Sequence, residues 1–251
     1  MNIRLTLLAL SFSFSITTAI AQSKSSTLKT QTTATTSGIY RGVFKIKTGL
    51  EVPFNFEIDK NKITFLNAEE RFEGGKVYQI GDSVKIKIDQ FDNELAFKIS
   101  GDSLIGTLRK QDNSGKPISV VAKRGENFRF KPSGEKPTAD FSGTYDVVFK
   151  NPNGTDEKTV GVFKQTGNKL TGTFLRITGD SRYLEGIVEG NNFYLSSFIG
   201  STPSYYRGTF SNNKEIVGES VNARGSIAFN GIQNQNADLP DAYKLTYLKE
   251  G

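Results

Sequence analysis

The sequence predicts an all-β protein built from two consecutive antiparallel meander units. Apolar residues alternate with polar ones along many short stretches, turn-forming residues recur at intervals of about 8–12 residues, and a segment near the start returns in the second half. After the first 21 residues, no stretch sustains the i, i+3, i+4 apolar spacing of a helix. The pattern fits small barrels and open sandwiches alike.

Residues 1–21 are typical of a secretory signal. Arg4 supplies a positive start, the stretch from Leu5 to Ile20 is apolar or hydroxylated, and Ala19-Ile20-Ala21 forms a small-x-small cleavage site. An uncleaved membrane anchor is the alternative, although hydroxyl groups interrupt the apolar run. We therefore expect an exported protein, periplasmic or extracellular, with no stable membrane span after cleavage.

The first β unit is predicted to cover residues 37–131. Residues 22–36, rich in Ser, Thr, Gln and Lys, precede it as a disordered tether. Within the unit, period-two alternation marks strands at 52–58, 84–88, 95–99 and 118–122. Turns are predicted throughout the chain where Gly, Asn and Asp gather, since these residues tolerate tight turns: 59–61, 73–75, 81–82, 101–102, 167–168, 189–191 and 212–213.

A second β unit is predicted at 141–235, after a linker at 132–140 that holds two prolines and a glycine. Its opening, from Gly143 to Lys150, matches Gly38 to Lys45 at five of eight positions. Further on, the segment 56–64 is echoed by 163–171. An internal duplication explains these matches, and chance similarity between β-rich segments is the alternative.

Composition excludes several classes of chemistry. The chain has no Cys and no His, which rules out thiol exchange, imidazole-based triads and Cys/His zinc sites, and no cofactor is predicted. The formal charge of +6 is spread along the chain, so no nucleic-acid partner is expected. Two carboxylates could still serve a glycosidase, but no spacing selects a pair. An oxygen-rich cluster that could hold calcium lacks the EF-hand pattern, and no metal site is predicted: Asp89, Asp92, Asn93 and Glu94.

Two groups of residues are candidate binding residues. Asp180, Arg182, Tyr183 and Glu185 form a polar cluster that could dock a partner or could simply be a hairpin with an ordinary ion pair. Tyr205 and Tyr206 follow an aromatic-rich strand at 193–198. Since consecutive strand residues face opposite sides, we expect one tyrosine in the core and the other exposed at a binding surface.

Several segments resemble the N-terminal region of exported TlpA-like proteins, which are thioredoxin-fold disulfide reductases. The resemblance lies in Thr173 to Gly186 (TFLRITGDSRYLEG), in the tail from Leu239 to Gly251, in the opening GIYRGV at 38–43 and in PFNFE at 53–57. It spans about 38–251. It implies that the tail, 236–251, would lead into a thioredoxin fold with a Cys-x-x-Cys pair, which this sequence does not contain.

One departure from the family concerns the segment 198–203, FIGSTP. The family has an Asp and a His where this chain carries Ile199 and Thr202, so that acid–imidazole pair is missing. The redox activity of the family cannot be carried by this chain, because disulfide exchange needs a thiolate.

The sequence therefore predicts a non-catalytic extracytoplasmic β module, the accessory or binding region of a TlpA-like system, either truncated or detached from it. Its partner would be an envelope protein or a separate thioredoxin-fold protein. The alternative is a lipocalin-like carrier with a small apolar ligand inside one barrel.

Overall fold

The computed structural model describes residues 36–46, 49–211 and 214–240, all within one compact unit at 33–251. The predicted signal, all of the predicted tether except Thr36, and the tail beyond residue 240 lie outside the described residues. Thr36 itself is buried, and its carbonyl accepts a hydrogen bond of 2.8 Å from the Tyr40 hydroxyl. In the described part of the chain, no helix has the length and apolar character to cross a membrane.

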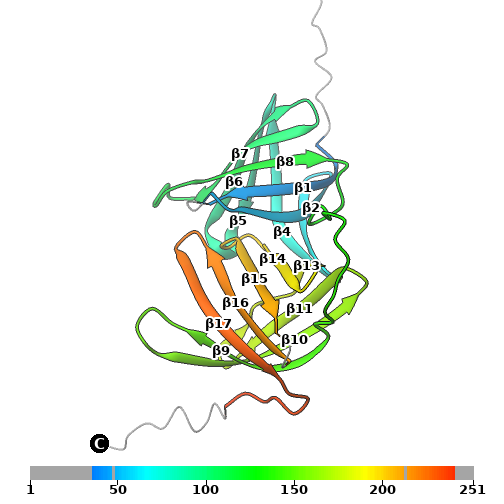
Figure 1. Ribbon diagram of the computed structural model, residues 1–251. Coiled ribbons are helices and arrows are strands. Elements are labelled where there is room, and N and C mark those ends of the chain that lie inside the picture. The colour runs from blue at the N-terminus through cyan, green and yellow to red at the C-terminus, as the bar shows by residue number, and fades with distance from the viewer. Residues whose placement is uncertain (1–35, 47–48, 212–213, 241–251) are drawn as a thin grey trace, which may run out of the picture. The chain divides into compact units, whose positions relative to one another are not determined.

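The first eight strands form a closed antiparallel meander barrel (Figure 1). Each strand pairs with the next, and β1 pairs with β8 to close the sheet. The strands are β1 (Gly38–Lys45), β2 (Glu51–Asp59), β3 (Lys62–Asn67), β4 (Glu70–Ile80), β5 (Ser83–Ile88), β6 (Asn93–Ser100), β7 (Ser103–Lys110) and β8 (Ile118–Arg124). A 3-10 turn, η1 (Asp89–Phe91), joins β5 to β6.

The second half of the chain repeats this topology. Eight strands pair in sequence and close through β9–β17, while the two-residue strand β12 (Gly179–Asp180) is added at the end of β11. The eight are β9 (Gly143–Lys150), β10 (Asp156–Thr166), β11 (Lys169–Arg176), β13 (Leu184–Glu189), β14 (Asn192–Ser197), β15 (Ser204–Phe210), β16 (Glu215–Asn222) and β17 (Gly225–Gln233). The all-β prediction with two consecutive meander units is confirmed, and both units are barrels.

Strand alternation follows the sequence where one face meets solvent. In β5, Val84, Ile86 and Ile88 are fully buried and the lysines between them are exposed. Strand β2 is different, because Val52 through Phe56 is buried on both faces. Its outer face is covered: the Pro53 carbonyl accepts a 2.6 Å bond from the Ser196 hydroxyl of the second barrel.

Most of the predicted turns join strands as expected. Turns at 59–61, 81–82, 101–102, 167–168 and 189–191 connect successive strands, and 212–213 lies outside the described residues. The predicted turn at 73–75 is wrong. This segment lies inside β4, where the register shifts by one residue and produces a β-bulge. Gly75 has a φ of 140°, and a Cβ there would lie 2.0 Å from the Lys87 carbonyl oxygen, so the bulge requires glycine.

Aromatic rings fill both barrels. In the first, Tyr40 stacks on Phe56, Phe56 on Phe54 and Phe54 on Phe44, with ring centroids 4.4–5.4 Å apart. In the second, Phe174 contacts Phe149, Phe163, Tyr206 and Phe229 at 5.1–5.3 Å. Each ring removes a large apolar area from water, which stabilises a chain without disulfides.

The two barrels also share a local feature that supports the duplication. Tyr40 in β1 and Tyr145 in β9 occupy the same position of the repeated opening segment, and both are buried. Each donates its hydroxyl to the carbonyl of the residue four positions earlier, Thr36 in one case and Phe141 in the other.

Residues 125–142, the connecting segment, join the barrels and are partly packed between them. Phe130 packs against the first core and lies 6.0 Å from Tyr205 of the second barrel, while Phe141 belongs to the second core. Further along, the Thr138 amide donates to the Gly190 carbonyl at 2.7 Å, and the Ser133 amide donates to Glu189 at 2.5 Å. The stretch predicted as a linker is thus attached to the second barrel.

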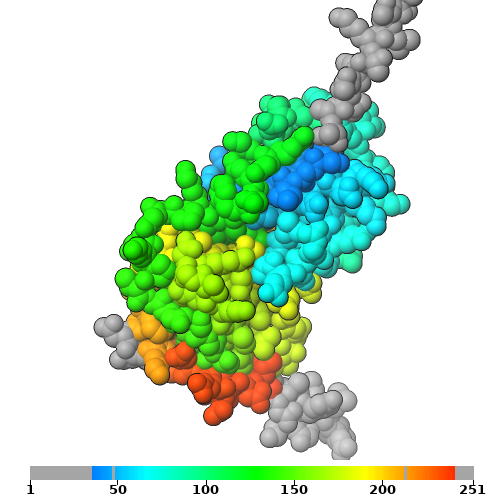
Figure 2. All heavy atoms as spheres, turned by 90° about the vertical axis from the view of Figure 1, so that its right-hand side faces the viewer, coloured from blue at the N-terminus to red at the C-terminus, as the bar shows by residue number. Residues whose placement is uncertain are grey.

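The barrels meet through corresponding connections. The β3–β4 turn contacts the start of β13, next to the β11–β13 connection, because the Ala68 amide donates to Glu185 at 2.7 Å. The first residue of β6, next to the β5–β6 connection, contacts the β14–β15 connection, because the Asn93 amide group donates to the carbonyls of Gly200 and Ser201 at 2.7 and 3.0 Å. In Figure 2 the cyan surface of the first barrel meets the yellow-green surface of the second.

Candidate ligand-binding site

Part of the predicted cluster at 180–185 faces the first barrel. The Arg182 backbone has a φ of 61°, held by a hydrogen bond from its amide to the Asp180 carboxylate at 2.9 Å. This conformation directs the Arg182 guanidinium to Glu70 of the first barrel, with which it forms an ion pair, and places it 5.4 Å from the Phe72 ring.

Glu185 also contacts the first barrel. The Glu185 carboxylate accepts from the Ala68 amide at 2.7 Å and lies 3.6 Å from Lys169 and 4.0 Å from Arg129. Tyr183 is 53% exposed. Arg182 and Glu185 therefore contact the protein's own first barrel, and Tyr183 is the large exposed side chain of the cluster.

The prediction for the two tyrosines is wrong, since both are buried. Tyr206 points into the second core and is 5% exposed, as alternation requires. Tyr205 points out of the second barrel but is covered by the first, whose hydrophobic cluster it joins, and is 6% exposed. Burial raises the pKa of Tyr205 to about 12, and nearby Tyr194 adds to the shift.

The segment 198–203, which departs from the family pattern, closes the end of the first barrel. Phe198 is 1% exposed and makes edge contacts with Phe44, Phe54 and Phe65 at 4.7–5.0 Å. Its backbone is fixed by Asn67, which donates to the Phe198 carbonyl at 3.1 Å. Phe198 therefore closes this end of the first barrel.

Arg129 of the connecting segment fixes the same junction from the side. Its guanidinium is buried and donates to the carbonyls of Pro53 and Leu66 and to the side-chain oxygen of Asn67. Burial lowers its pKa to about 10, an effect that Glu185 opposes, so the group is charged at neutral pH.

Two of the four residues considered for calcium, Asn93 and Glu94, have other partners. Glu94 is nearly buried and accepts two hydrogen bonds from Arg109, at 2.7 and 3.2 Å. Asn93 is engaged with the second barrel, as described above. Across the residues that the structure describes, no group of three or more potential ligand side chains gathers.

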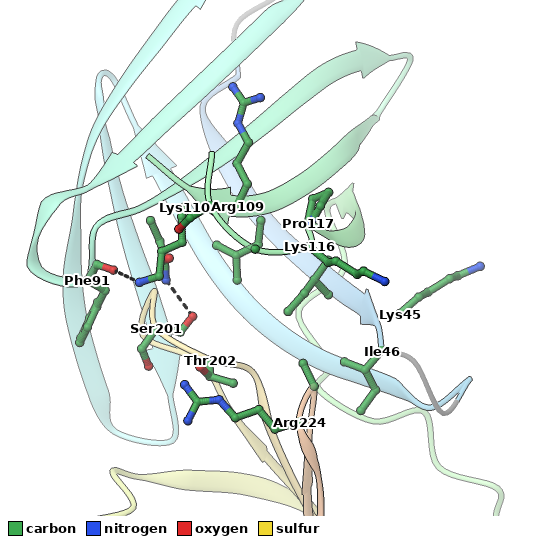
Figure 3. A pocket seen from close by; sticks show the side chains of 16 residues that line it. Lys45, Ile46, Phe91, Arg109, Lys110, Lys116, Pro117, Ser201, Thr202 and Arg224 are labelled. Atoms are coloured by element: carbon green, nitrogen blue, oxygen red, sulfur yellow. Dashed lines mark hydrogen bonds between the residues drawn. The ribbon is translucent and has the colours of Figure 1, made fainter. Parts of the chain in front are cut away.

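A pocket of about 590 Å³, the junction pocket, opens where the first barrel meets the second (Figure 3). Its first-barrel wall comes from the end of β1, the η1 turn and the β7–β8 hairpin, and its second-barrel wall comes from Ser201, Thr202, Ala223 and Arg224. The volume lies within the range of about 300–1,000 Å³ that is common for small-molecule sites.

Five cationic residues line the junction pocket, and no lining residue is acidic among the described residues: Lys45, Arg109, Lys110, Lys116 and Arg224. Arg109 is paired with Glu94, and the Lys110 ammonium donates to the Phe91 carbonyl at 2.9 Å. The remaining three, Lys45, Lys116 and Arg224, form no ion pair with any described carboxylate. Figure 3 shows Lys45 and Lys116 on one side of the pocket and the Arg224 guanidinium below Thr202.

The rest of the lining is largely apolar. Ile46 and Leu108 are buried members of the first core, while Phe91, Ile118 and Ala223 are half-buried and pack against it. Such a surface attracts anions electrostatically and apolar groups through burial. The hydroxyls of Ser114, Ser201 and Thr202 add hydrogen-bonding groups without an imidazole to activate them.

Sequence reasoning missed this pocket, because its five cations come from three regions that lie far apart along the chain, at 45, at 109–116 and at 224. A partial signal was present: Arg109, Lys110 and Lys116 lie close together before the strand predicted at 118–122.

Comparison with known proteins gives little similarity. No family model matches the chain, and no curated protein matches it. One similar solved structure is a protein of unknown function from the DUF3598 family of Nostoc punctiforme: 9% identity, TM-score 0.24, covering 78% of this chain and 95% of that one. Another is isotype 1 transferrin binding protein B from serogroup B Neisseria meningitidis: 10% identity, TM-score 0.19, covering 79% and 77%. At these TM-scores neither structure defines a function for this chain.

Proposed function

We propose that this protein is a non-catalytic binding module that holds an organic anion in the junction pocket. The observation that carries the proposal is a group of three cations, Lys45, Lys116 and Arg224, that form no ion pair with any described carboxylate and surround a pocket whose described lining has no carboxylate. In such a site an anion gains Coulomb attraction that is larger than in bulk water, because the walls are partly apolar.

A binding role agrees with the chemistry of the chain. It offers neither thiol nor imidazole, and Glu94, a buried acid near the pocket, is held in an ion pair with Arg109. We further propose that the module acts outside the cytoplasm, on the strength of the signal-like segment at 1–21.

The test is a titration of the mature protein, beginning at residue 22, with the fluorescent trianion pyranine, read by fluorescence anisotropy. We expect saturable binding that weakens as NaCl is raised from about 20 to about 500 mM, since salt screens the attraction. The triple variant Lys45→Glu/Lys116→Glu/Arg224→Glu should lose binding by at least about tenfold.

A matched control makes the same change in charge elsewhere. Lys60, Lys85 and Lys164 are exposed and lie outside the pocket lining, so Lys60→Glu/Lys85→Glu/Lys164→Glu should bind pyranine as the wild type does. Equal losses in the two triple variants would show that net charge and not the pocket binds the anion, and would refute the proposal.

A second candidate is the role of accessory module in a TlpA-like disulfide-reductase system. It is favoured by the resemblance at 173–186, and within that segment Tyr183 is exposed on the surface. We expect a TlpA-like thioredoxin domain to bind the wild-type protein in a calorimetric titration and to bind Tyr183→Ala more weakly. Absence of heat with the wild type would exclude this role.

A further inference from the structure

The junction pocket combines two surfaces that one simple ion would not use together. Lys45, Lys116 and Arg224 present charge, whereas Leu108 and Phe91 belong to the apolar part of the lining. Figure 3 places Phe91 across the pocket from Lys45 and Lys116. A ligand that uses the whole lining therefore has an anionic end and an apolar end.

The apolar part is a continuation of the first barrel's core. Ile46 and Leu108 are 5% and 4% exposed and contribute both to that core and to the pocket wall. Ile118 and Ala223 pack against the same cluster and are only half-covered. Contact with an aliphatic chain would remove this remaining apolar surface from water.

The polar groups are placed to hold the charged end. Ser201 and Thr202 lie between the first barrel's wall and the Arg224 side chain in Figure 3. The backbone of this segment is held in place by Asn93, whose side-chain amide donates to the carbonyls of Gly200 and Ser201. This fixed geometry lowers the cost of ordering the site when a ligand binds.

We propose that the ligand of the junction pocket is a monomeric anionic amphiphile: a single aliphatic chain ending in a carboxylate or phosphate. The charged end lies at Lys45, Lys116 and Arg224, and the chain extends over Leu108 and Ile118 towards Phe91. This inference rests on the proposed function, since it specifies the ligand of the same pocket.

The experiment compares butyrate, hexanoate, octanoate and decanoate as competitors of pyranine, each below its micelle concentration. We expect affinity to rise about two- to fourfold for each added CH2, the upper value corresponding to full burial. Octanol, the neutral analogue of octanoate, should compete at least about tenfold more weakly, and decyl phosphate should compete as decanoate does.

Ile118→Asn changes the apolar wall without touching a cation. It should reduce the gain in affinity per added CH2, and saturable pyranine binding shows that the variant is folded. Lys45→Gln/Lys116→Gln should weaken the binding of octanoate and leave the binding of octanol unchanged.

The outcomes separate the two proposals. If pyranine binds at the pocket and the affinity for the carboxylates does not change with chain length, the inference of an amphiphilic ligand is wrong and the proposed anion site stands. If neither pyranine nor decanoate binds, the proposed function itself fails. Sedimentation of the protein with phosphatidylglycerol vesicles, without binding of monomeric decanoate, would identify a membrane surface as the ligand and overturn the inference.

Discussion

At the scale of single residues, the junction depends on side chains that satisfy backbone groups of the opposite element. Arg129 is the clearest case, since its guanidinium bonds two carbonyls and one side-chain oxygen in a site closed to water. A buried charge is costly unless its partners are in place, and removing it leaves those partners unpaired.

Arg129→Ala should therefore lower the free energy of unfolding by about 3–5 kcal/mol, the usual cost of breaking a buried charged network. Urea unfolding followed by circular dichroism measures the change. Lys131→Ala, at an exposed position two residues on, should shift the free energy by no more than about 0.5 kcal/mol. A loss in Arg129→Ala as small as in the control would contradict the assigned role.

Two buried tyrosines predict a loss of stability in alkali. Burial raises the pKa of Tyr145 and of Tyr205 to about 12, against an ordinary value of 10.0. The protonated forms therefore stabilise the folded state below pH 10, and this contribution is lost as the pH rises towards 12. We expect each tyrosine to account for about 2 kcal/mol of that loss.

The check is urea unfolding between pH 9 and pH 12. Tyr145→Phe and Tyr205→Phe should each show a smaller fall over this range than the wild type, even though Tyr145→Phe also loses a hydrogen bond at every pH. Tyr183→Phe, which removes an exposed hydroxyl, should follow the wild-type curve. Identical curves for all four proteins would contradict the argument.

At the scale of elements, the bulge in β4 and the closing strand pairs give the barrels their curvature. Gly75 combines a positive φ with a close approach to the Lys87 carbonyl, whereas Gly101, in the β6–β7 turn, has a φ of 58° and open space around its Cα. Comparing substitutions at the two glycines therefore distinguishes the cost of a left-handed backbone from the cost of a steric clash.

Gly101→Ala should lower the free energy of unfolding by about 1–2 kcal/mol, the cost of a left-handed conformation for a residue with a Cβ. Gly75→Ala adds a clash with backbone and should cost at least about 2 kcal/mol more. Thermal and urea unfolding of both variants test the difference. Equal losses would show that β4 relaxes around the new methyl group.

The alternation of apolar and polar residues predicted the strands well where one face meets solvent, as in β5. It was wrong at Tyr205 because the outer face of β15 is covered by the first barrel, and it could not foresee that β2 is buried on both sides for the same reason. It also mistook the bulge at Gly74 and Gly75 for a turn, since both features use glycine.

At the scale of the whole molecule, the junction links the two cores. Phe198 and Tyr205 of the second barrel belong to the hydrophobic cluster of the first. The described barrels should therefore unfold together, although each has a core of its own.

In a calorimetric scan the wild type should give equal calorimetric and van't Hoff enthalpies, the sign of one cooperative transition. Phe198→Ala removes the ring that fills the end of the first barrel and should cost about 3–5 kcal/mol. It should also raise the ratio of the two enthalpies above one. Phe198→Leu keeps an apolar group there, and both its stability and its ratio of enthalpies should lie between those of the wild type and of Phe198→Ala. Two separate transitions in the wild type would contradict this coupling.

The sequence alone could not predict the candidate site, because its residues come together only in the folded molecule. Arg182 and Glu185 are recognisable as a polar cluster, but their partners Glu70 and Ala68 are over 100 positions away. The cations of the junction pocket come together only once both barrels have closed and met.

The meeting of corresponding connections has an evolutionary consequence. Contacts between equivalent patches are the mark of an isologous dimer, in which each subunit offers the other the same surface. A one-barrel ancestor that self-associated through this end would have built the walls of the pocket from the same surface of both copies. If the two halves arose as copies joined in one polypeptide, each half was free to diverge, and Arg224 from one half facing Lys45 and Lys116 from the other is the asymmetry that such a fusion permits.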